Sequence, residues 1–220
     1  MSDIEISKIM WLKDSRWRKL SDARKYMQWG ITEKSVKDIA YRPFDMRKIY
    51  YDRKIIDWWR FDVMPNMFNE NLMIVSWKQT KKDATHFLIT ESLVDFNLTW
   101  SAWAHWSWYC FSLFLYSDNG SERRLNLKPE IVTKLVENYQ LTGDEESIGR
   151  QIMSYIYAIL YSPSYRTQFS QFLKSDFPRI PWVESREDFL QLAELGSQLI
   201  DLHLLHDVPE IDDLGAYPIP

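Results

Sequence analysis

The hydrophobic pattern of this chain changes near residue 125, and that change constrains its fold more than any other feature. Beyond it, apolar residues recur at every fourth position, which is the spacing of one helix face. They are Ile148, Ile152, Ile156 and Leu160. Before it, short β-prone runs alternate with polar turns, at 48–51, 72–76, 86–90 and 106–116. We therefore expect an α+β fold, with a strand-containing N-terminal half built on a mixed or antiparallel sheet and an all-helical C-terminal half.

Two local signals in the second half predict where helices begin. Ser162 and Pro163 form the pattern of an N-cap followed by a first helical residue, so we expect a helix from there to about Leu173. Ser185 and Asp188 have the spacing of a capping pair at the start of a last helix. The expected apolar stripe of that helix is Leu192, Leu195, Leu199 and Leu202.

The length of 220 residues suits one large domain or two small lobes. We divide the chain into an N-terminal lead-in (1–40), a β-rich lobe (41–128) and a helical lobe with an acidic tail (129–220). The three parts could also form a single compact domain. In either case the chain is long enough to bury a core.

Charge is distributed unevenly along the chain. The total of 27 basic and 31 acidic residues gives a net charge of −4. Residues 1–60 carry 15 basic and 9 acidic residues, net +6, whereas residues 183–220 carry one basic and nine acidic residues, net −8. Because local fields steer association, the acidic total does not exclude an anionic partner for the first half.

Sequence signatures of the common reaction classes are missing. The six glycines form no phosphate-cradling loop, and no Gly-x-Ser-x-Gly nucleophile elbow is present. His203 and His206 lie three apart without an evident acidic partner, so we favour a helix face over a metal site. The one cysteine, Cys110, lies in an apolar aromatic run and is expected to be an inert buried thiol. We assign no catalytic residue, no metal ligand and no cofactor.

Membrane and export signals are also missing. No apolar run approaches the roughly 18 residues of a spanning helix, and the first residues lack a signal-peptide core. We expect a cytoplasmic protein without a membrane partner. Four tryptophans between 100 and 108 indicate either core packing or a surface for a base, a sugar ring or a partner protein.

Three aromatic segments occur in a characteristic order. YRPFDMRKIYYD (41–52) comes first, FSLFLY (111–116) follows, and YIYAILYSPSYRTQFSQFLKSDFPRIPW (155–182) leads into LHLLH (202–206). This ordered set, from about Ile39 to His206, resembles the C-terminal specificity region of type ISP restriction–modification enzymes. Ser112 departs from the proline usual at that position. The Asn-Pro-Pro-aromatic motif of the methyltransferase that precedes this region in the family is absent from the sequence.

The resemblance implies a sequence-specific double-stranded DNA recognition module. Catalysis would come from a methyltransferase/translocase polypeptide and a nuclease supplied elsewhere, and this chain would not be an enzyme by itself. Two alternatives stay open: a protein-interaction or assembly module for a methyltransferase partner, and a non-functional remnant of a larger restriction enzyme.

Within that interpretation, cations hold phosphates and set the register, while side chains in a groove read base edges. We expect the loop after residue 77 and a second loop after the Asn119-Gly120 turn to enter a groove. Arg42, Asp45 and Arg47 could instead form an internal ion network beside Pro43. The candidate DNA-binding residues are Arg42, Arg47, Lys48, Arg53, Lys54, Arg60, Lys78, Gln79, Lys81, Lys82, Arg123 and Arg124.

Overall fold

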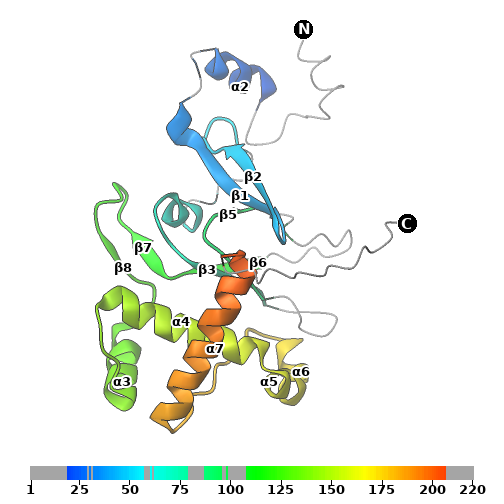
Figure 1. Cartoon of the computed structure of the whole chain (residues 1–220). Helices are drawn as coiled ribbons and strands as arrows, with labels where there is room; N and C mark the ends of the chain where they lie inside the picture. Colours follow the sequence, from blue (N-terminus) through cyan, green and yellow to red (C-terminus); the bar gives the residue numbers. More distant parts are fainter. Residues whose placement is uncertain are drawn as a thin grey trace, which may run out of the picture. The chain divides into compact units, whose positions relative to one another are not determined.

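The structure, a computed structural model, describes residues 19–28, 30, 32–56, 60, 62–78, 87–95, 98 and 108–206. The chain divides into two compact units. Unit 1 comprises residues 1–75 and 90–126, and unit 2 comprises residues 76–89 and 127–220. Strands concentrate in the first half and long helices in the second, which confirms the α+β expectation (Figure 1). Within the described ranges, every helix is too short or too polar to cross a membrane.

The short strands form three sheets, with orders β2-β1-β5, β4-β3-β6 and β7-β8, and the first and third belong to unit 1. β1 pairs antiparallel with β2 and parallel with β5, so the first sheet is mixed. The first strand begins at Val36, inside the segment expected as a lead-in. The division between the units falls within β3 and β4. The elements are α2 (Leu20–Met27), η1 (Glu33–Ser35), β1 (Val36–Arg42), β2 (Asp45–Tyr50), η2 (Met64–Phe68), β3 (Met73–Trp77), β4 (Leu88–Thr90), β5 (Leu93–Val94), β6 (Trp108–Ser112), β7 (Phe114–Tyr116) and β8 (Arg123–Leu125).

Two buried asparagines connect the elements of unit 1. The amide of Asn71 donates to the carbonyls of Asn66 (3.0 Å) and Phe114 (2.9 Å). Its oxygen accepts from the backbone N–H groups of Leu72 (2.9 Å) and Phe114 (3.0 Å). Asn66 in turn accepts from the N–H of Tyr116 at 2.8 Å. These bonds satisfy backbone groups that no neighbouring strand pairs, and they fix the β7–β8 hairpin to η2.

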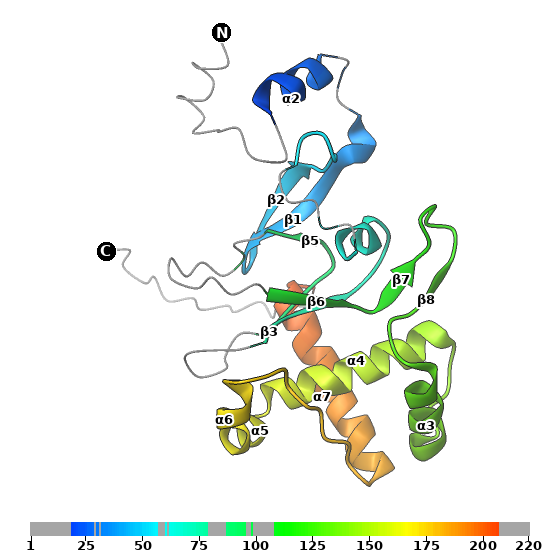
Figure 2. The same cartoon turned by 180° about the vertical axis from the view of Figure 1, so that it is seen from behind.

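Unit 2 is helical, and its two long helices α4 and α7 cross in close contact (Figure 2). A Cβ atom at Gly196 of α7 would lie 1.9 Å from the carbonyl oxygen of Ser154 in α4, so the crossing requires glycine there. The helices are α3 (Pro129–Tyr139), α4 (Glu145–Tyr161), α5 (Pro163–Gln168), α6 (Ser170–Leu173) and α7 (Arg186–Leu204).

Stacked aromatic rings fill the core of unit 2. Phe189 stacks on Tyr139 with ring centroids 4.1 Å apart and on Tyr155 at 4.6 Å. Tyr155 also stacks on Trp182 at 5.2 Å, and its hydroxyl donates to the carbonyl of Pro181 at 2.7 Å. The rings therefore fasten the extended 179–183 segment to the helices. Burial raises the pKa of Tyr155 to about 12, so the hydroxyl stays protonated and keeps donating.

Both predicted helix caps are confirmed. The side chain of Ser162 accepts from the N–H of Tyr165, and that of Ser185 accepts from the N–H of Asp188. The single helix expected from Ser162 to about Leu173 is wrong. The chain leaves helical geometry at Phe169 (φ −103°, ψ 15°), so two short helices, α5 and α6, take its place.

The leucine stripe expected on the last helix is wrong for two of its four members, whereas Leu192 and Leu199 are half-buried. Leu195 and Leu202 are 58% and 44% exposed. Because Gly196 allows the closest approach to α4, the packed face is centred on that residue, and the flanking leucines turn away from the contact. The buried residues of α7 are Phe189, Ala193, Gly196 and Ile200.

Candidate nucleic-acid interface

The two-stranded ribbon of β1 and β2 sorts its basic residues onto two faces. Ile39 lies opposite Arg47, and Asp38 lies opposite Lys48. Directly paired residues share a face and successive residues alternate, so Arg47 and Lys48 project in opposite directions. Lys48 Nζ lies 2.6 Å from the Asp38 carboxylate on its own face. Of these two predicted cations, only one can therefore face a given partner.

Tyr41 supports two guanidinium groups. The Cζ atoms of Arg42 and Arg47 lie 4.1 and 3.9 Å from the centre of its ring. Arg47 donates to both carboxylate oxygens of Asp45, at 3.1 and 2.8 Å, and this pairing lowers the pKa of Asp45. Arg42 lies 3.5 Å from Asp95. The ion network considered for this segment is thus confirmed for Asp45 and Arg47, while Arg42 pairs elsewhere.

The turn of the ribbon carries an aromatic residue in an unusual backbone conformation. Phe44 has φ of 63°, and its side chain is 63% exposed. Pro43 before it has a φ fixed near −65°. A negative φ followed by a positive φ is typical of the two central residues of a type II turn, and the second of these positions usually takes Gly or Asn. A bulky residue there costs about 1–2 kcal/mol.

Three further predicted cations follow the ribbon. Arg53 is exposed. Lys54 Nζ lies 4.5 Å from the ring of Tyr26. Arg60 is half-buried, with its guanidinium 5.4 Å from the ring of Trp108, and this favours a packing role for it.

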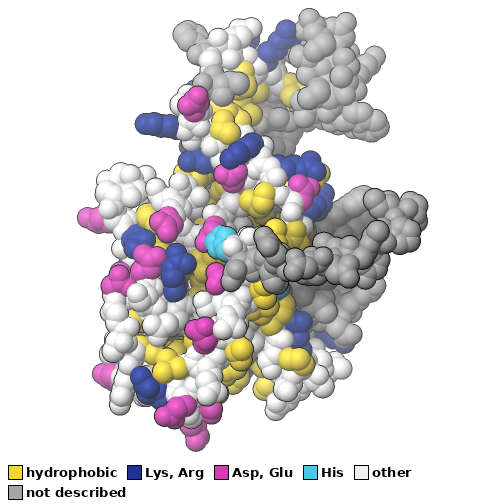
Figure 3. All heavy atoms as spheres, viewed as in Figure 1, with side chains coloured by type: hydrophobic (Ala, Val, Ile, Leu, Met, Phe, Trp, Pro, Cys, Tyr) yellow, Lys and Arg dark blue, Asp and Glu magenta, His cyan; other side chains and the backbone are white. Residues whose placement is uncertain are grey.

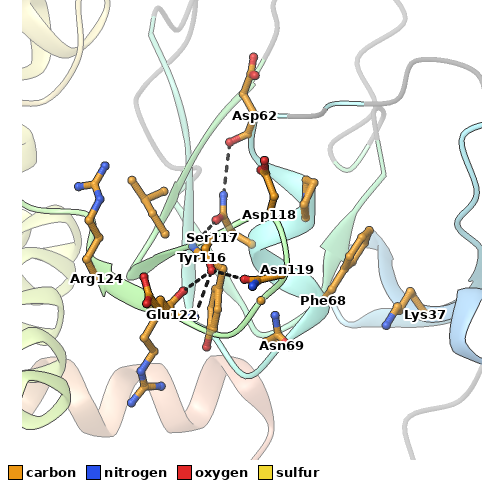
Figure 4. A pocket seen from close by; sticks show the side chains of 15 residues that line it. Lys37, Asp62, Phe68, Asn69, Tyr116, Ser117, Asp118, Asn119, Glu122 and Arg124 are labelled. Atoms are coloured by element: carbon orange, nitrogen blue, oxygen red, sulfur yellow. Dashed lines mark hydrogen bonds between the residues drawn. The ribbon is translucent and has the colours of Figure 1, made fainter.

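A groove of about 1050 Å³ opens between β1, η2 and the β7–β8 hairpin (Figure 4). Lys37 and Phe68 lie on one side of the view, and Glu122 and Arg124 lie on the other. Arg123 also lines it, 4.2 Å from the ring of Phe114. Its basic and acidic lining residues are Lys37, Arg123, Arg124, Asp62, Asp118 and Glu122.

The position expected for Arg123 and Arg124 is wrong in one respect. They belong to strand β8, paired with Tyr116 and Leu115, because the hairpin closes immediately after Glu122. Lys37 joins them in the groove and was missed by sequence analysis. Its signal was the alternation along β1, which places it two residues before Ile39 on the face of Arg47.

The remaining predicted contact residues belong to unit 2. Lys78 is exposed, with Nζ 5.8 Å from the ring of Phe177. Gln79, Lys81 and Lys82 lie outside the described residues. Trp108 is buried at 5% exposure, and the other three tryptophans of its cluster also lie outside the described ranges.

The groups considered for chemistry are engaged in packing. Burial raises the pKa of the Cys110 thiol to about 12, which opposes thiolate formation. His203 Nδ1 lies 2.6 Å from the hydroxyl of Tyr157. In the part of the chain that the structure describes, no three His, Cys, Asp or Glu residues gather as a metal site. Figure 3 shows dark blue and magenta side chains close together in the region of the β1–β2 ribbon, and a group of magenta side chains where α7 begins.

The chain matches one family over nearly its whole length. Residues 7–219 match the model of the Type ISP C-terminal specificity domain, so the chain belongs to this family. The family resemblance inferred from the three aromatic segments is thereby confirmed. No curated protein matches the chain.

Three solved structures share the fold. A DrdV–DNA complex has a TM-score of 0.68 over 94% of this chain. LlaBIII, an ATP-dependent Type ISP restriction–modification enzyme bound to DNA, has a TM-score of 0.65 over 92% of this chain. A nuclease-deletion mutant of the Type ISP enzyme LlaGI in complex with a DNA substrate mimic has a TM-score of 0.57 over 81% of this chain. Each is 24% identical, and the chain covers only 20%, 13% and 12% of the three chains.

Proposed function

We propose that this chain recognises a specific sequence in double-stranded DNA as the specificity module of a restriction–modification enzyme. The observation that carries this is the match to a specificity-domain family over residues 7–219. The three similar structures are all complexes with DNA or a DNA mimic, which supports the same partner. The module itself is non-catalytic, and an adenine methyltransferase/translocase polypeptide and a nuclease act with it in the cytoplasm.

The proposed contacts on unit 1 divide into two roles. Arg42 and Arg47, preorganised on Tyr41, hold phosphates and set the register of the duplex. Arg123 and Arg124, together with Lys37, border a groove whose hydrogen-bond donors and acceptors suit the recognition of base edges. Lys48, on the opposite face of the ribbon, contributes mainly to the local field. Arg60 is proposed to position the ribbon through Trp108. The remaining proposed contacts are Arg53 and Lys54 of unit 1 and, as a separate element, Lys78, Gln79, Lys81 and Lys82 of unit 2.

The acidic residues near these cations favour specific over indiscriminate binding. Asp45 and Asp95 already neutralise part of the charge of Arg47 and Arg42. A duplex must therefore offer contacts beyond phosphate charge to bind well, because each phosphate contact is partly offset by a nearby carboxylate.

The test is selection from a pool of randomised 30-base-pair duplexes with the full chain, followed by affinity measurements at several salt concentrations. We expect one short sequence to be enriched. The double variant Arg42→Ala/Arg47→Ala should lower affinity roughly tenfold or more and reduce the slope of log K against log salt by about 1–2.

The matched control is Arg150→Ala/Arg186→Ala in unit 2, which removes the same charge. Arg150 pairs with Glu146 at 3.0 Å, and Arg186 donates to the carbonyl of Tyr139. This control should leave the slope unchanged. If no sequence is enriched at any salt concentration, the proposed function is wrong.

A further inference from the structure

The tip of the β1–β2 ribbon combines strain with exposure. Phe44 occupies the left-handed region at φ 63°, a conformation in which a bulky side chain is unfavourable. Phe44 is also 63% exposed, so its ring is accessible to a partner. Strained residues of this kind gather at functional sites, so the outlier calls for a function.

The surroundings of the tip indicate a partner that is both charged and apolar. Arg42 and Arg47 flank the turn and are held on the ring of Tyr41, at 4.1 and 3.9 Å. Met46, just beyond the turn, is also exposed. The turn lies at the end of the ribbon remote from α2 (Figures 1 and 2). The turn at the end of this two-stranded element thus combines an exposed apolar residue, Phe44, with a cation on each side of it in the sequence.

We propose that Phe44 is a wedge that inserts between two neighbouring base pairs of the duplex bound by unit 1. The proposal rests on the proposed DNA-binding function and adds to it a site of DNA distortion. Apolar side chains that unstack a base step kink the duplex, and flanking cations hold the phosphates on either side of the opened step. The two-stranded ribbon is narrow enough to enter a groove of B-DNA.

The backbone conformation allows a test that does not disturb folding. Gly and Asn both tolerate positive φ, so Phe44→Gly and Phe44→Asn retain the turn while removing the ring. Both variants should unfold at a denaturant concentration no lower than wild type. The control Phe169→Asn makes the same change at another exposed phenylalanine, in unit 2.

The probe is a duplex enriched by the wild-type chain from a randomised pool. With wild type, we expect permanganate to oxidise thymines at one step of this duplex, because unstacking exposes them. Phe44→Gly and Phe44→Asn should lose this reactivity and bind roughly tenfold more weakly. Their salt slope should match wild type, because no phosphate contact is lost. Phe44→Met, which keeps an apolar wedge, should retain the reactive step, and Phe169→Asn should resemble wild type in every respect.

Two results would overturn the wedge while leaving DNA recognition intact. The first is an enriched duplex that Phe44→Gly binds as tightly as wild type, with the same thymine reactivity. The second is unchanged DNA binding together with lost association with a methyltransferase/translocase polypeptide, which would assign the tip to a protein contact. A wild-type chain that enriches no sequence would refute the proposed function itself and the wedge with it.

Discussion

Unit 1 and unit 2 are stabilised by different kinds of contact. Short strands in unit 1 are joined by the side chains of Asn66 and Asn71, and its surface carries paired cations. In unit 2, two long helices approach to backbone contact at Gly196, and stacked rings fill the space beside them. Unit 1 contains 17 basic and 15 acidic residues, a net charge of +2. Unit 2 contains 10 basic and 16 acidic residues, a net charge of −6.

This difference indicates a division of labour. A surface that recognises an anion needs cations on elements whose direction is fixed, and the asparagine bonds and the Tyr41 ring supply that in unit 1. Within unit 2, residues 127–220 carry 7 basic and 15 acidic residues, and this net charge of −8 disfavours contact with phosphates. The aromatic core of the helices suits a stable scaffold.

Gly196→Ala should destabilise the helical unit by about 3 kcal/mol. The new methyl group would lie 1.9 Å from the Ser154 oxygen and 3.2 Å from the Cβ of Ala158, so α4 and α7 must separate. Denaturant unfolding followed by far-ultraviolet circular dichroism measures the change. Ser197→Ala, at the next and exposed position, should stay within about 0.5 kcal/mol of wild type. Equal stability of the two variants would contradict the close helix crossing.

Asn71→Ala should destabilise unit 1 by about 2 kcal/mol, because it leaves the buried N–H and C=O of Phe114 without their partner. Hydrogen exchange at the amides of 114–125 should accelerate, since the β7–β8 hairpin keeps the Asn66–Tyr116 bond but loses both bonds between Asn71 and Phe114. Asn138→Ala, an exposed amide on α3, serves as the control and should have little effect. Unchanged exchange in the hairpin would show that the asparagine bonds are dispensable.

Stability of unit 2 should fall as the pH drops below about 6.5. Burial, followed by the charge of Arg166, lowers the pKa of His203, so the folded state binds fewer protons than the unfolded state. The contribution is therefore present above the unfolded pKa and is lost as the pH falls. Unfolding free energies at pH 8 and pH 5.5 measure it. His203→Gln should reduce this pH dependence, and His206→Gln should retain it. A pH dependence that is lost in His206→Gln and retained in His203→Gln would refute the assignment to His203.

Asp45→Asn should raise DNA affinity by about two- to fivefold, because it removes a negative charge from the carboxylate that pairs with Arg47. Asp38→Asn removes the same charge on the opposite face of the ribbon, beside Lys48. Titrations of a selected duplex compare the two variants. A larger gain from Asp38→Asn would mean that the opposite face contacts DNA.

Local patterns predicted much of this fold. The caps at Ser162 and Ser185 depend only on neighbouring residues, and both form as expected. The exposure of Leu195 and Leu202 was not predictable, because it follows from the approach of a distant helix at Gly196. For the same reason, leucine content alone misjudged which face of α7 is buried.

In the candidate interface, too, the features that depend on neighbouring residues were predictable and those that depend on distant residues were not. Arg42, Arg47 and Arg123 were identified from sequence because they flank recognisable turns. Some of their partners are also close in sequence, such as Tyr41 and Asp45 for Arg47. The pairing of Arg42 with Asp95 was not predictable, because Asp95 is 53 residues away in the chain. Lys37 was missed because its approach to Arg123 and Arg124 depends on the η2 and hairpin contacts that form the groove.

Photo-crosslinking of the full chain to a selected duplex, with the attached peptides mapped by mass spectrometry, tests the central claim most directly. We predict crosslinks in the ribbon and the segment after it (36–54), at residues 78–82, and in the β7–β8 hairpin (114–126). Crosslinks confined to helices α3–α7 would contradict the account, because the helical unit would then be the part that contacts DNA.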